Sequence, residues 1–322
     1  MPEGSSIHRH ARIVNRLFHD SPVTVTSPQG RFSQGAAAIS RKYPGRARAW
    51  GKHLFWPFLE SPDMPDNECN TWLHIHLGLY GRWAFAGLGL TQLGGAGIRV
   101  ARHDSDNLVG TIDGGKDATT KIFDPDGLTG SPTPIDNLVA TPTTRMRIES
   151  DTAIAQLSGP TRCEVATFSD ITATINRLGP DPIRNDASDC ERFISLARSK
   201  RSPIGQVVMD QSVVAGPGNI YRADCLWRVG INPLRKASNV SKKRLGTLWD
   251  DLVTCMRNDI DTGIIVTIPD EYRPETPIET DPELMRFAVY HRTGKPCVRC
   301  GTPISEKLML ARRLFWCSGC QR

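Results

Sequence analysis

The sequence predicts a multidomain α+β protein, and three observations lead to that prediction. The chain has 322 residues, enough for about two compact domains. Its first half is rich in alternating apolar and polar residues behind one helical segment, whereas the chain is mostly helical from about residue 181. Two close pairs of cysteines follow near the C-terminus. We therefore expect a β-rich domain, a helical domain and a small C-terminal module.

The N-terminal domain begins with an expected amphipathic helix, because Ile7, Ala11, Val14 and Phe18 recur with helical spacing. Pro2 suits a helix start. Alternating runs at 23–26 and 72–77 predict half-buried strands, and residues 146–148 resume that pattern. Residues 84–144 are rich in Gly, Asp, Thr and Pro and predict a loop insertion. The domain is expected to span residues 1–165.

The helical domain is expected over residues 181–262, with helical stretches at 188–199, 204–209, 220–229 and 242–259. Residues 215–218 read Ala-Gly-Pro-Gly, which permits a tight reversal between helices. Asn219 can cap the helix that follows, and the N-terminus of a helix also binds phosphate. Alone, such a turn is more often structural than functional.

The C-terminal module is expected over residues 285–322, after an acidic connector at 263–284. The spacing of its cysteines predicts that it binds one structural zinc ion. Cys297 and Cys300 form one close pair, and Cys317 and Cys320 form another after a spacer of sixteen residues. Four thiolates on two turns can converge on a tetrahedral Zn²⁺. Hydrolytic metal chemistry is not expected, because four cysteines leave no open coordination position. The remaining cysteines have no such spacing and are expected to be buried thiols: Cys69, Cys163, Cys190, Cys225 and Cys255.

Charge is unevenly distributed along the chain, whose formal net charge is +6. Basic residues outnumber acidic ones nine to three in residues 1–60, eleven to two in 192–244 and eight to one in 285–322. Residues 259–283 carry eight acids against one arginine. Three basic blocks suit a polyanionic partner, although solvated basic faces remain an alternative. The sequence has no apolar run of about 20 residues and carries an acid at residue 3, so we expect a cytoplasmic protein with no membrane partner.

Five motifs occur in the order found in one family. They are Pro-Glu-Gly at 2–4, Gly-Lys-His-Leu-Phe at 51–55, His-Leu-Gly-Leu-Tyr-Gly at 76–81, Asp-Gln-Ser at 210–212 with the glycine turn through Tyr221, and the four cysteines. The chain thereby resembles the bacterial formamidopyrimidine-DNA glycosylase/endonuclease VIII family over most of its length except 84–144. Pro-Glu-Gly resembles the endonuclease VIII branch, which removes oxidised pyrimidines. The resemblance implies an N-terminal β-sandwich, a helix–two-turn–helix domain and a zinc finger, with DNA bound between them.

The resemblance also implies catalytic roles for Pro2, Glu3, Lys52 and Arg312. Once Met1 is removed, the Pro2 amine would attack C1′ of the damaged nucleotide and form an iminium, while Glu3 acts as general acid/base. An N-terminal amine has a pKa of about 7.7–8.0, so part of it is neutral near pH 7. Lys52 matches the family's strand lysine, a proton donor in β-elimination. Arg312, five residues before Cys317, is preferred to Arg313 as the finger-tip phosphate holder that assists δ-elimination.

DNA contacts are expected at Asn219, His76, Gly78, Leu79 and Tyr80. Asn219 matches a phosphate holder, and residues 78–80 match the loop that fills the space of the extruded nucleotide. His74 and His76 form a His-x-His pair, which we interpret as groove-facing polar residues because no third metal ligand is evident; His76 is assigned a phosphate contact. Many endonuclease VIII sequences carry glutamine in place of Gly78, and Ser158 stands where some relatives have a basic residue.

The resulting hypothesis is a bifunctional DNA glycosylase/AP lyase that excises oxidised bases, with pyrimidines favoured, and cleaves the strand by β,δ-elimination. The expected partner is damaged DNA, with no nucleotide cofactor and a monomeric protein. Two alternatives stay open. The same chemistry could prefer oxidised purines, or the chain could be a non-catalytic zinc-finger DNA-binding protein that has kept the fold.

Overall fold

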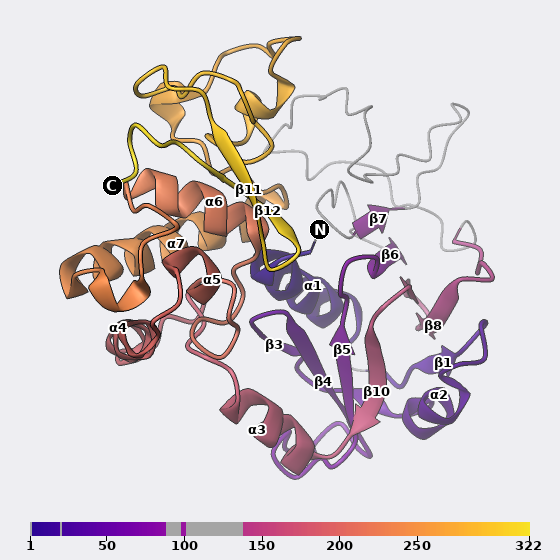
Figure 1. The fold of residues 1–322 in the computed structure, drawn as a ribbon. Coiled ribbons are helices and arrows are strands. Elements are labelled where there is room, and N and C mark those ends of the chain that lie inside the picture. The colour runs from indigo at the N-terminus through magenta and orange to yellow at the C-terminus, as the bar shows by residue number, and fades with distance from the viewer. Residues whose placement is uncertain (1, 20, 88–97, 101–137) are drawn as a thin grey trace. The chain divides into compact units, whose positions relative to one another are not determined.

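The computed structural model describes residues 2–19, 21–87, 98–100 and 138–322 (Figure 1). The chain divides into two compact units, of which the first comprises residues 1–2 and 6–175 and the second residues 3–5 and 176–322. Helix α1 (Gly4–Leu17) therefore contributes its first two residues to the second unit and the rest to the first. None of the helices in the described residues is long and apolar enough to cross a membrane.

The first unit is mostly strands, as the sequence predicts. Besides α1 it contains α2 (Ser33–Ile39) and α3 (Phe168–Asn176). Its strands are β1 (Thr24–Thr26), β2 (Tyr43–Pro44), β3 (Arg48–Trp50), β4 (His53–Leu59), β5 (Trp72–His76), β6 (Arg82–Gly87), β7 (Ile98–Val100), β8 (Thr144–Glu149), β9 (Ala153–Ser158) and β10 (Arg162–Ala166). Helix α3 was not predicted, although Phe168, Ile171 and Ile175 recur along it with helical spacing.

These strands form two sheets around a common core. One sheet has the order β1-β8-β9-β6-β7, and the other has the order β10-β5-β4-β2 with β3 paired to β4. Trp56 and Ile75 of the second sheet belong to the same buried cluster as Trp83 and Met146 of the first. The β-sandwich implied by the resemblance is confirmed. The apolar face of α1, formed by Ile7, Ala11, Val14 and Phe18, is buried in this core as predicted.

Strand alternation directs one face of the second sheet into the main core, while the outer face carries histidines beside a second buried cluster that includes Phe55 and Trp72. On β4, Leu54 and Trp56 belong to the core, whereas His53 and Phe55 alternate with them. On β5, Leu73 and Ile75 belong to the core, and His74 and His76 alternate with them in the same way. Histidines therefore gather on the outer face of the second sheet.

The expected insertion at 84–144 is shorter than predicted at its N-terminal end. Residues 84–87 complete β6, and residues 98–100 form β7, which pairs with β6 in parallel. The weak apolar signal of these strands is embedded in a glycine-rich sequence, which explains why it was read as loop. Residues 88–97 and 101–137 lie outside the described residues.

The second unit contains the predicted helices in order. They are α4 (Asp189–Ser199), α5 (Ile204–Val207), α6 (Asn219–Arg228) and α7 (Lys242–Thr262), with 3₁₀ turns η2 (Ala237–Asn239), η3 (Asp270–Tyr272) and η4 (Pro282–Met285). Helix α7 starts where the Ser241 hydroxyl accepts the Arg244 N–H and ends at Gly263, whose φ of 72° suits glycine. A cluster of buried residues from α4, α6 and α7, including Phe193, Tyr221 and Trp249, forms its core.

The C-terminal module packs against this helical core. Its hairpin consists of β11 (Ser305–Met309) and β12 (Arg312–Trp316). Trp227 of α6 shares a buried cluster with Cys297, Phe315 and Cys317 of the module. The helical domain, connector and module predicted from the sequence therefore lie in one compact unit.

Candidate functional site

The carboxylate of Glu3 is bound by the first turn of helix α6. Glu3 is completely buried. Its Oε2 accepts the Gly218 N–H at 2.6 Å, and its Oε1 accepts the Ile220 N–H at 3.0 Å. The first N–H groups of a helix have no partner within the helix and carry partial positive charge, so a carboxylate is stabilised there. The anion at this helix N-terminus is thus a side chain of the chain itself.

Glycines make this approach possible. A Cβ on Gly218 would lie 2.6 Å from Cδ of Glu3, and a Cβ on Gly4 would lie 2.8 Å from Cα of Gly216. The Gly4 N–H donates to the Gly216 carbonyl at 2.9 Å. The glycine turn at 215–218 is therefore required by the close passage of residues 3 and 4.

Gln211 of the Asp-Gln-Ser motif holds that turn. Its Oε1 accepts the Gly216 N–H at 2.9 Å, and its Nε2 donates to the Pro217 carbonyl at 3.0 Å. Asp210 accepts the N–H and hydroxyl of Ser212 at 3.0 and 2.6 Å. The motif that contributed to the family resemblance therefore has a structural role, which the sequence analysis did not assign.

A second buried acid, Asp259 of α7, lies in the same network. The Tyr221 hydroxyl is hydrogen-bonded to Asp259 and also, at 2.7 Å, to the hydroxyl of Ser5. Burial raises the pKa of Asp259 to about 7, and the charge of Glu3 acts in the same direction. No role was predicted for Ser5, Tyr221 or Asp259, because hydroxyl, aromatic and acidic residues within helices are usually structural.

Pro2 precedes Glu3 and is buried. Its nitrogen becomes a secondary amine only when Met1 is removed. Covalent geometry then places that amine beside the residue whose carboxylate α6 holds. The predicted nucleophile, Pro2, is thus covalently joined to Glu3, whose carboxylate is held by hydrogen bonds from Gly218 and Ile220.

Asn219 connects helix α6 to the hairpin of the module. Its Nδ2 donates to the Arg313 carbonyl at 2.9 Å, and its Oδ1 accepts from Nη2 of Arg222. The side chain is buried. Arg313 itself binds Glu306 through Nε at 2.5 Å and Nη2 at 2.6 Å, whereas Arg312 is half-buried beside it on β12.

Arg222 is a further member of this group that the sequence analysis missed. Its side chain is fully buried, and its Nε and Nη1 have no hydrogen-bond partner within the described residues. Burial lowers the pKa of Arg222 to about 10, and the neighbouring Arg312 acts in the same direction. The Arg222 guanidinium therefore lies near that of Arg312 with two of its own nitrogen atoms unpartnered among the described residues, an arrangement that favours an anionic ligand.

Lys52 and the predicted loop residues lie in the first unit. Gly51 and Lys52 form the tight turn between β3 and β4, where the φ of Gly51 is 56°, and Lys52 is half-buried. Leu79 and Tyr80 follow β5 with 48% and 80% of their surface exposed. Such exposure of two large apolar side chains fits the predicted wedge.

Gly78 cannot be replaced simply by the glutamine of many relatives. Its φ is 66°, and a Cβ would lie 2.3 Å from Cγ2 of Thr161. The loop backbone in this chain is therefore built around a residue without a side chain.

His53 of β4 contacts both histidines of β5, His74 and His76. Nδ1 of His53 is 2.9 Å from Nε2 of His74, and the rings of His53 and His76 lie 4.8 Å apart. Burial and nearby positive charges lower the pKa of His53 to about 3 and that of His74 to about 4. The pKa of His76 is lowered for the same reasons, with Lys52 and Arg162 as the charges. These rings are not among the groups of the described residues whose ligand atoms lie close enough together to hold a metal ion.

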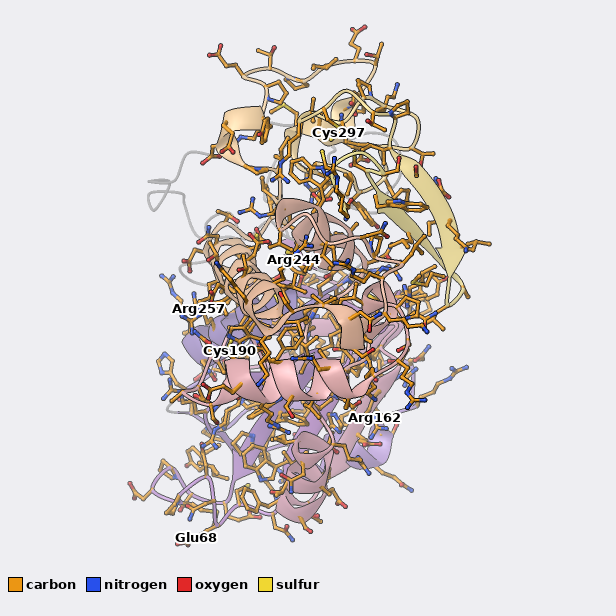
Figure 2. All side chains as sticks on the ribbon, turned by 60° about the vertical axis from the view of Figure 1, so that its left-hand side comes forward. Glu68, Arg162, Cys190, Arg244, Arg257 and Cys297 are labelled. Atoms are coloured by element: carbon orange, nitrogen blue, oxygen red, sulfur yellow. The ribbon has the colours of Figure 1, made fainter. Side chains whose placement is uncertain are left out.

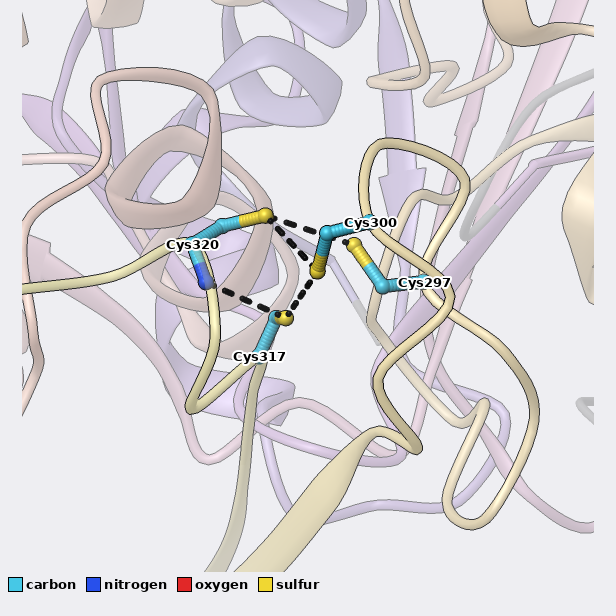
Figure 3. Close-up of side chains that lie close together, drawn as sticks. All are labelled: Cys297, Cys300, Cys317 and Cys320. Atoms are coloured by element: carbon cyan, nitrogen blue, oxygen red, sulfur yellow. Dashed lines mark hydrogen bonds between the residues drawn. The ribbon is translucent and has the colours of Figure 1, made fainter.

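The four cysteines of the module face one another from two loops (Figure 3). The Sγ atoms of Cys297 and Cys320 are 3.7 Å apart, those of Cys300 and Cys317 are 3.5 Å apart, and those of Cys300 and Cys320 are 3.2 Å apart. Sulfur ligands about 2.3 Å from a tetrahedral Zn²⁺ lie close to this far from one another. The donor set and spacing fit a closed tetrahedral metal centre.

The other cysteines differ in exposure. Cys69, Cys225 and Cys255 are buried as expected, whereas Cys163 and Cys190 are half-buried. Cys225 and Cys255 lie near Asp251, whose carboxylate is bound by Arg228 at 2.7 Å. That guanidinium supplies the counter-charge, so this group is explained without a metal ion.

Comparison with protein families and curated proteins gives concordant matches. Residues 178–269 match the family model described as formamidopyrimidine-DNA glycosylase H2TH domain. The chain is 33% identical over 323 residues to Endonuclease 8 1 of Mycobacterium bovis, with all of both chains covered. It is 37% identical over 146 residues to formamidopyrimidine-DNA glycosylase of Stenotrophomonas maltophilia, covering 45% of this chain and 52% of that protein.

Solved structures share the fold. MutM in complex with DNA containing carbocyclic 8-oxo-G superposes with a TM-score of 0.66 at 17% identity over the full length of both chains. MutM of Thermus thermophilus gives a TM-score of 0.67 at 20% identity, covering 99% of this chain and 98% of that one. At these identities the similarity establishes the architecture of sandwich, helical domain and C-terminal cysteine module.

Proposed function

The chain belongs to the formamidopyrimidine-DNA glycosylase/endonuclease VIII family, and we propose that it is a bifunctional DNA glycosylase and AP lyase of base excision repair. Its substrates are oxidised bases, with pyrimidines favoured. The observation that carries the proposal is the Glu3 carboxylate, fixed by the N–H groups of Gly218 and Ile220 directly after Pro2.

Pro2 is the proposed nucleophile. After removal of Met1, its nitrogen attacks C1′, the glycosidic C1′–N bond breaks, and the departing base takes a proton from solvent. The Glu3 carboxylate accepts the proton that the attacking nitrogen loses and passes it to the sugar ring oxygen as the ring opens, so that the C1′–nitrogen bond becomes an iminium. The backbone bonds to both carboxylate oxygens fix where that proton is delivered.

Strand cleavage follows from the iminium. It acidifies the C2′ proton, whose loss expels the 3′-phosphate, and a second elimination expels the 5′-phosphate. Lys52 serves as proton donor in the first elimination, and Arg312 assists the second by binding the leaving phosphate. Asn219 and His76 provide further phosphate contacts. Arg222, with two unpartnered nitrogen atoms near Arg312, strengthens the positive potential there.

Gly78, Leu79 and Tyr80 are proposed to fill the space left by the extruded nucleotide. Flipping a base costs a few kcal/mol, and apolar side chains inserted into the stack offset part of it. The exposure of Leu79 and Tyr80 supports this role.

One Zn²⁺ held by Cys297, Cys300, Cys317 and Cys320 is proposed as a structural cofactor. Bound there, it would supply folding free energy and no catalytic chemistry. These cysteines position the hairpin that carries Arg312. We further propose damaged DNA as partner, a monomeric protein without nucleotide cofactor, and a location in the bacterial cytoplasm at the nucleoid.

A panel of duplexes tests the function. Each duplex carries one oxidised pyrimidine, one oxidised purine or an abasic site, and strand cleavage is followed by gel electrophoresis. We expect cleavage at the abasic site and faster excision of pyrimidine lesions. Faster excision of purine lesions would reverse the proposed preference. Binding without any cleavage, by protein lacking Met1, would identify a non-catalytic DNA-binding protein.

A further inference from the structure

A polar row crosses the outer face of the second sheet. The strand register places Arg162 of β10 opposite His76 of β5, and His76 opposite His53 of β4. Residues directly opposite on antiparallel strands have Cβ atoms about 4.5–5.5 Å apart, so the three side chains form one patch. The proposed function uses only His76 from this row.

A backbone N–H favours one tautomer of His76. The Gly78 N–H donates to Nδ1 of His76 at 3.2 Å, and Oγ1 of Thr161 lies 3.0 Å from the same nitrogen. That nitrogen therefore carries a lone pair, and the neutral ring bears its proton on Nε2. Nε2 makes no hydrogen bond with the described residues, so a neutral His76 offers one N–H donor to a ligand. Its lowered pKa keeps the ring in this neutral form near pH 7.

The ring of His53 packs directly against His76, and His74 in turn contacts His53. His53 packs 4.8 Å from His76, centre to centre, and is itself bonded to His74. His74 is almost fully buried, and its Nδ1 is 3.5 Å from Oε1 of Glu164. The orientation of the His76 ring, and with it the direction of the Nε2–H donor, is therefore restricted by its packing against His53.

Arg162 supplies a positive charge at the same place. Its side chain, labelled in Figure 2, is 48% exposed, and Nη1 donates to Oε1 of Glu164 at 2.6 Å. A guanidinium has five N–H donors in a planar fork, so one bond to Glu164 leaves others available. The charges of Arg162 and Lys52 both act on His76. The positive charges of Arg162 and Lys52, together with the Nε2–H donor of His76, suit the binding of an oxyanion.

We propose that Arg162 and His76 together bind one phosphodiester group of the DNA backbone. The proposal rests on the proposed function, because its ligand is DNA. Arg162 provides charge-assisted donors and His76 provides the Nε2–H donor, while Glu164 orients the guanidinium. His53 directly follows Lys52, so this phosphate site continues the surface that begins at the lysine turn.

The salt dependence of binding tests Arg162. The full chain is titrated with a fluorescent duplex containing a tetrahydrofuran abasic-site analogue, which cannot be cleaved, at several salt concentrations. Each neutralised phosphate contributes about 0.9 to the slope of log affinity against log salt, so Arg162→Gln should lower the slope by roughly that amount and weaken binding. The matched control is Arg48→Gln, because Arg48 is 53% exposed on β3 of the same sheet and paired to Asp66 at 2.8 Å. Its slope should equal that of the unsubstituted protein. Equal slopes for both variants overturn the proposal.

Nitrogen NMR of the unsubstituted protein tests His76 without any mutation. We expect a protonated Nε2 and an unprotonated Nδ1 in the free protein, and a shift of the Nε2–H signal when the same duplex is added. A ring protonated on Nδ1, or an Nε2–H signal that DNA leaves unchanged, overturns the role of His76.

These outcomes are separable from those of the proposed function. A protein that cleaves abasic-site DNA but shows no change in slope with Arg162→Gln retains the activity and lacks this phosphate site. A protein that never cleaves DNA but loses slope with that variant has the site and lacks the activity.

Discussion

At the scale of single residues, the position of Glu3 depends on what surrounds it. The N–H groups of Gly218 and Ile220 fix its two oxygens, and the missing side chain of Gly218 leaves the space that the carboxylate occupies. A general acid must deliver its proton along one direction, and a displacement of about 1 Å can cost a hundredfold in rate. Gly218 is therefore as important for the proposed chemistry as the acid itself.

Gly218→Ala should lower the excision rate at least tenfold, because the added Cβ would lie 2.6 Å from Cδ of Glu3. Single-turnover cleavage of a lesion-containing duplex measures the effect. Gly246→Ala is the matched control. A Cβ on Gly246 of α7 would meet only Cδ1 of Ile194 at 3.9 Å, so this variant should keep full activity and gain about 0.5–1 kcal/mol of helix stability. Full activity in Gly218→Ala would show that the chemistry does not require Glu3 to be held close to the backbone of Gly218.

Asp259 should make stability depend on pH. Its pKa is raised from 3.8 to about 7, so the folded protein keeps a proton that the unfolded chain releases between about pH 4 and 7. This stabilisation is complete below pH 4 and is lost as pH rises through 7. Asp259→Asn mimics the protonated form and should become more stable relative to the unsubstituted protein by up to about 4 kcal/mol across that range. Thermal unfolding at pH 5 and 8 measures it, and a constant difference between the proteins would contradict the raised pKa.

At the scale of elements, patterns of neighbouring residues predicted those features of the fold that depend on residues close together in the sequence. The spacing of Ile7, Ala11, Val14 and Phe18 predicted α1, and the cysteine spacing predicted that Cys297, Cys300, Cys317 and Cys320 lie close together. The cradle of Glu3 could not be predicted, because it joins residues more than 200 positions apart through backbone N–H groups that every residue possesses. The family resemblance implied a role for Glu3, and the structure shows which backbone N–H groups bind its carboxylate.

The turn at the tip of the β11–β12 hairpin has a backbone conformation that its residue types do not predict. Leu310 and Ala311 connect β11 to β12 with φ of 53° and 56°, a conformation usually taken by Asn and Gly. For other residues it costs roughly 1–2 kcal/mol each. Leu310→Asn combined with Ala311→Gly should therefore raise the midpoint of thermal unfolding of the second unit. An unchanged or lower midpoint, measured by calorimetry, would contradict the strain assigned to this turn.

At the scale of the whole molecule, the net charge of +6 is the sum of three basic segments and the acidic residues elsewhere in the chain that partly offset them. Each basic block contains one proposed phosphate holder, namely Lys52, Asn219 or Arg312. The acidic connector at 263–284 instead contributes Asp281 to a buried pair with Arg292, at 2.8 Å, in the module. Charge along the chain is thus divided between binding a polyanion and stabilising the second unit.

The module and the helices should unfold together when metal is removed. Trp227 of α6 shares a core with Cys297, Phe315 and Cys317, and Asn219 is bonded to the Arg313 carbonyl. A chelator that extracts a structural Zn²⁺ should lower the unfolding temperature and abolish DNA binding, and added Zn²⁺ should restore both. Retention of DNA binding by metal-free protein, verified by elemental analysis, would exclude the module as a DNA contact.

The identity of the nucleophile can be tested by trapping the iminium. Protein lacking Met1 is incubated with abasic-site DNA and sodium borohydride, digested, and analysed by peptide mass spectrometry, which also verifies removal of Met1. We predict a stable complex with the deoxyribose remnant attached to the amine of Pro2. A remnant attached to a lysine such as Lys52, or no complex at all, would contradict catalysis by the N-terminal proline.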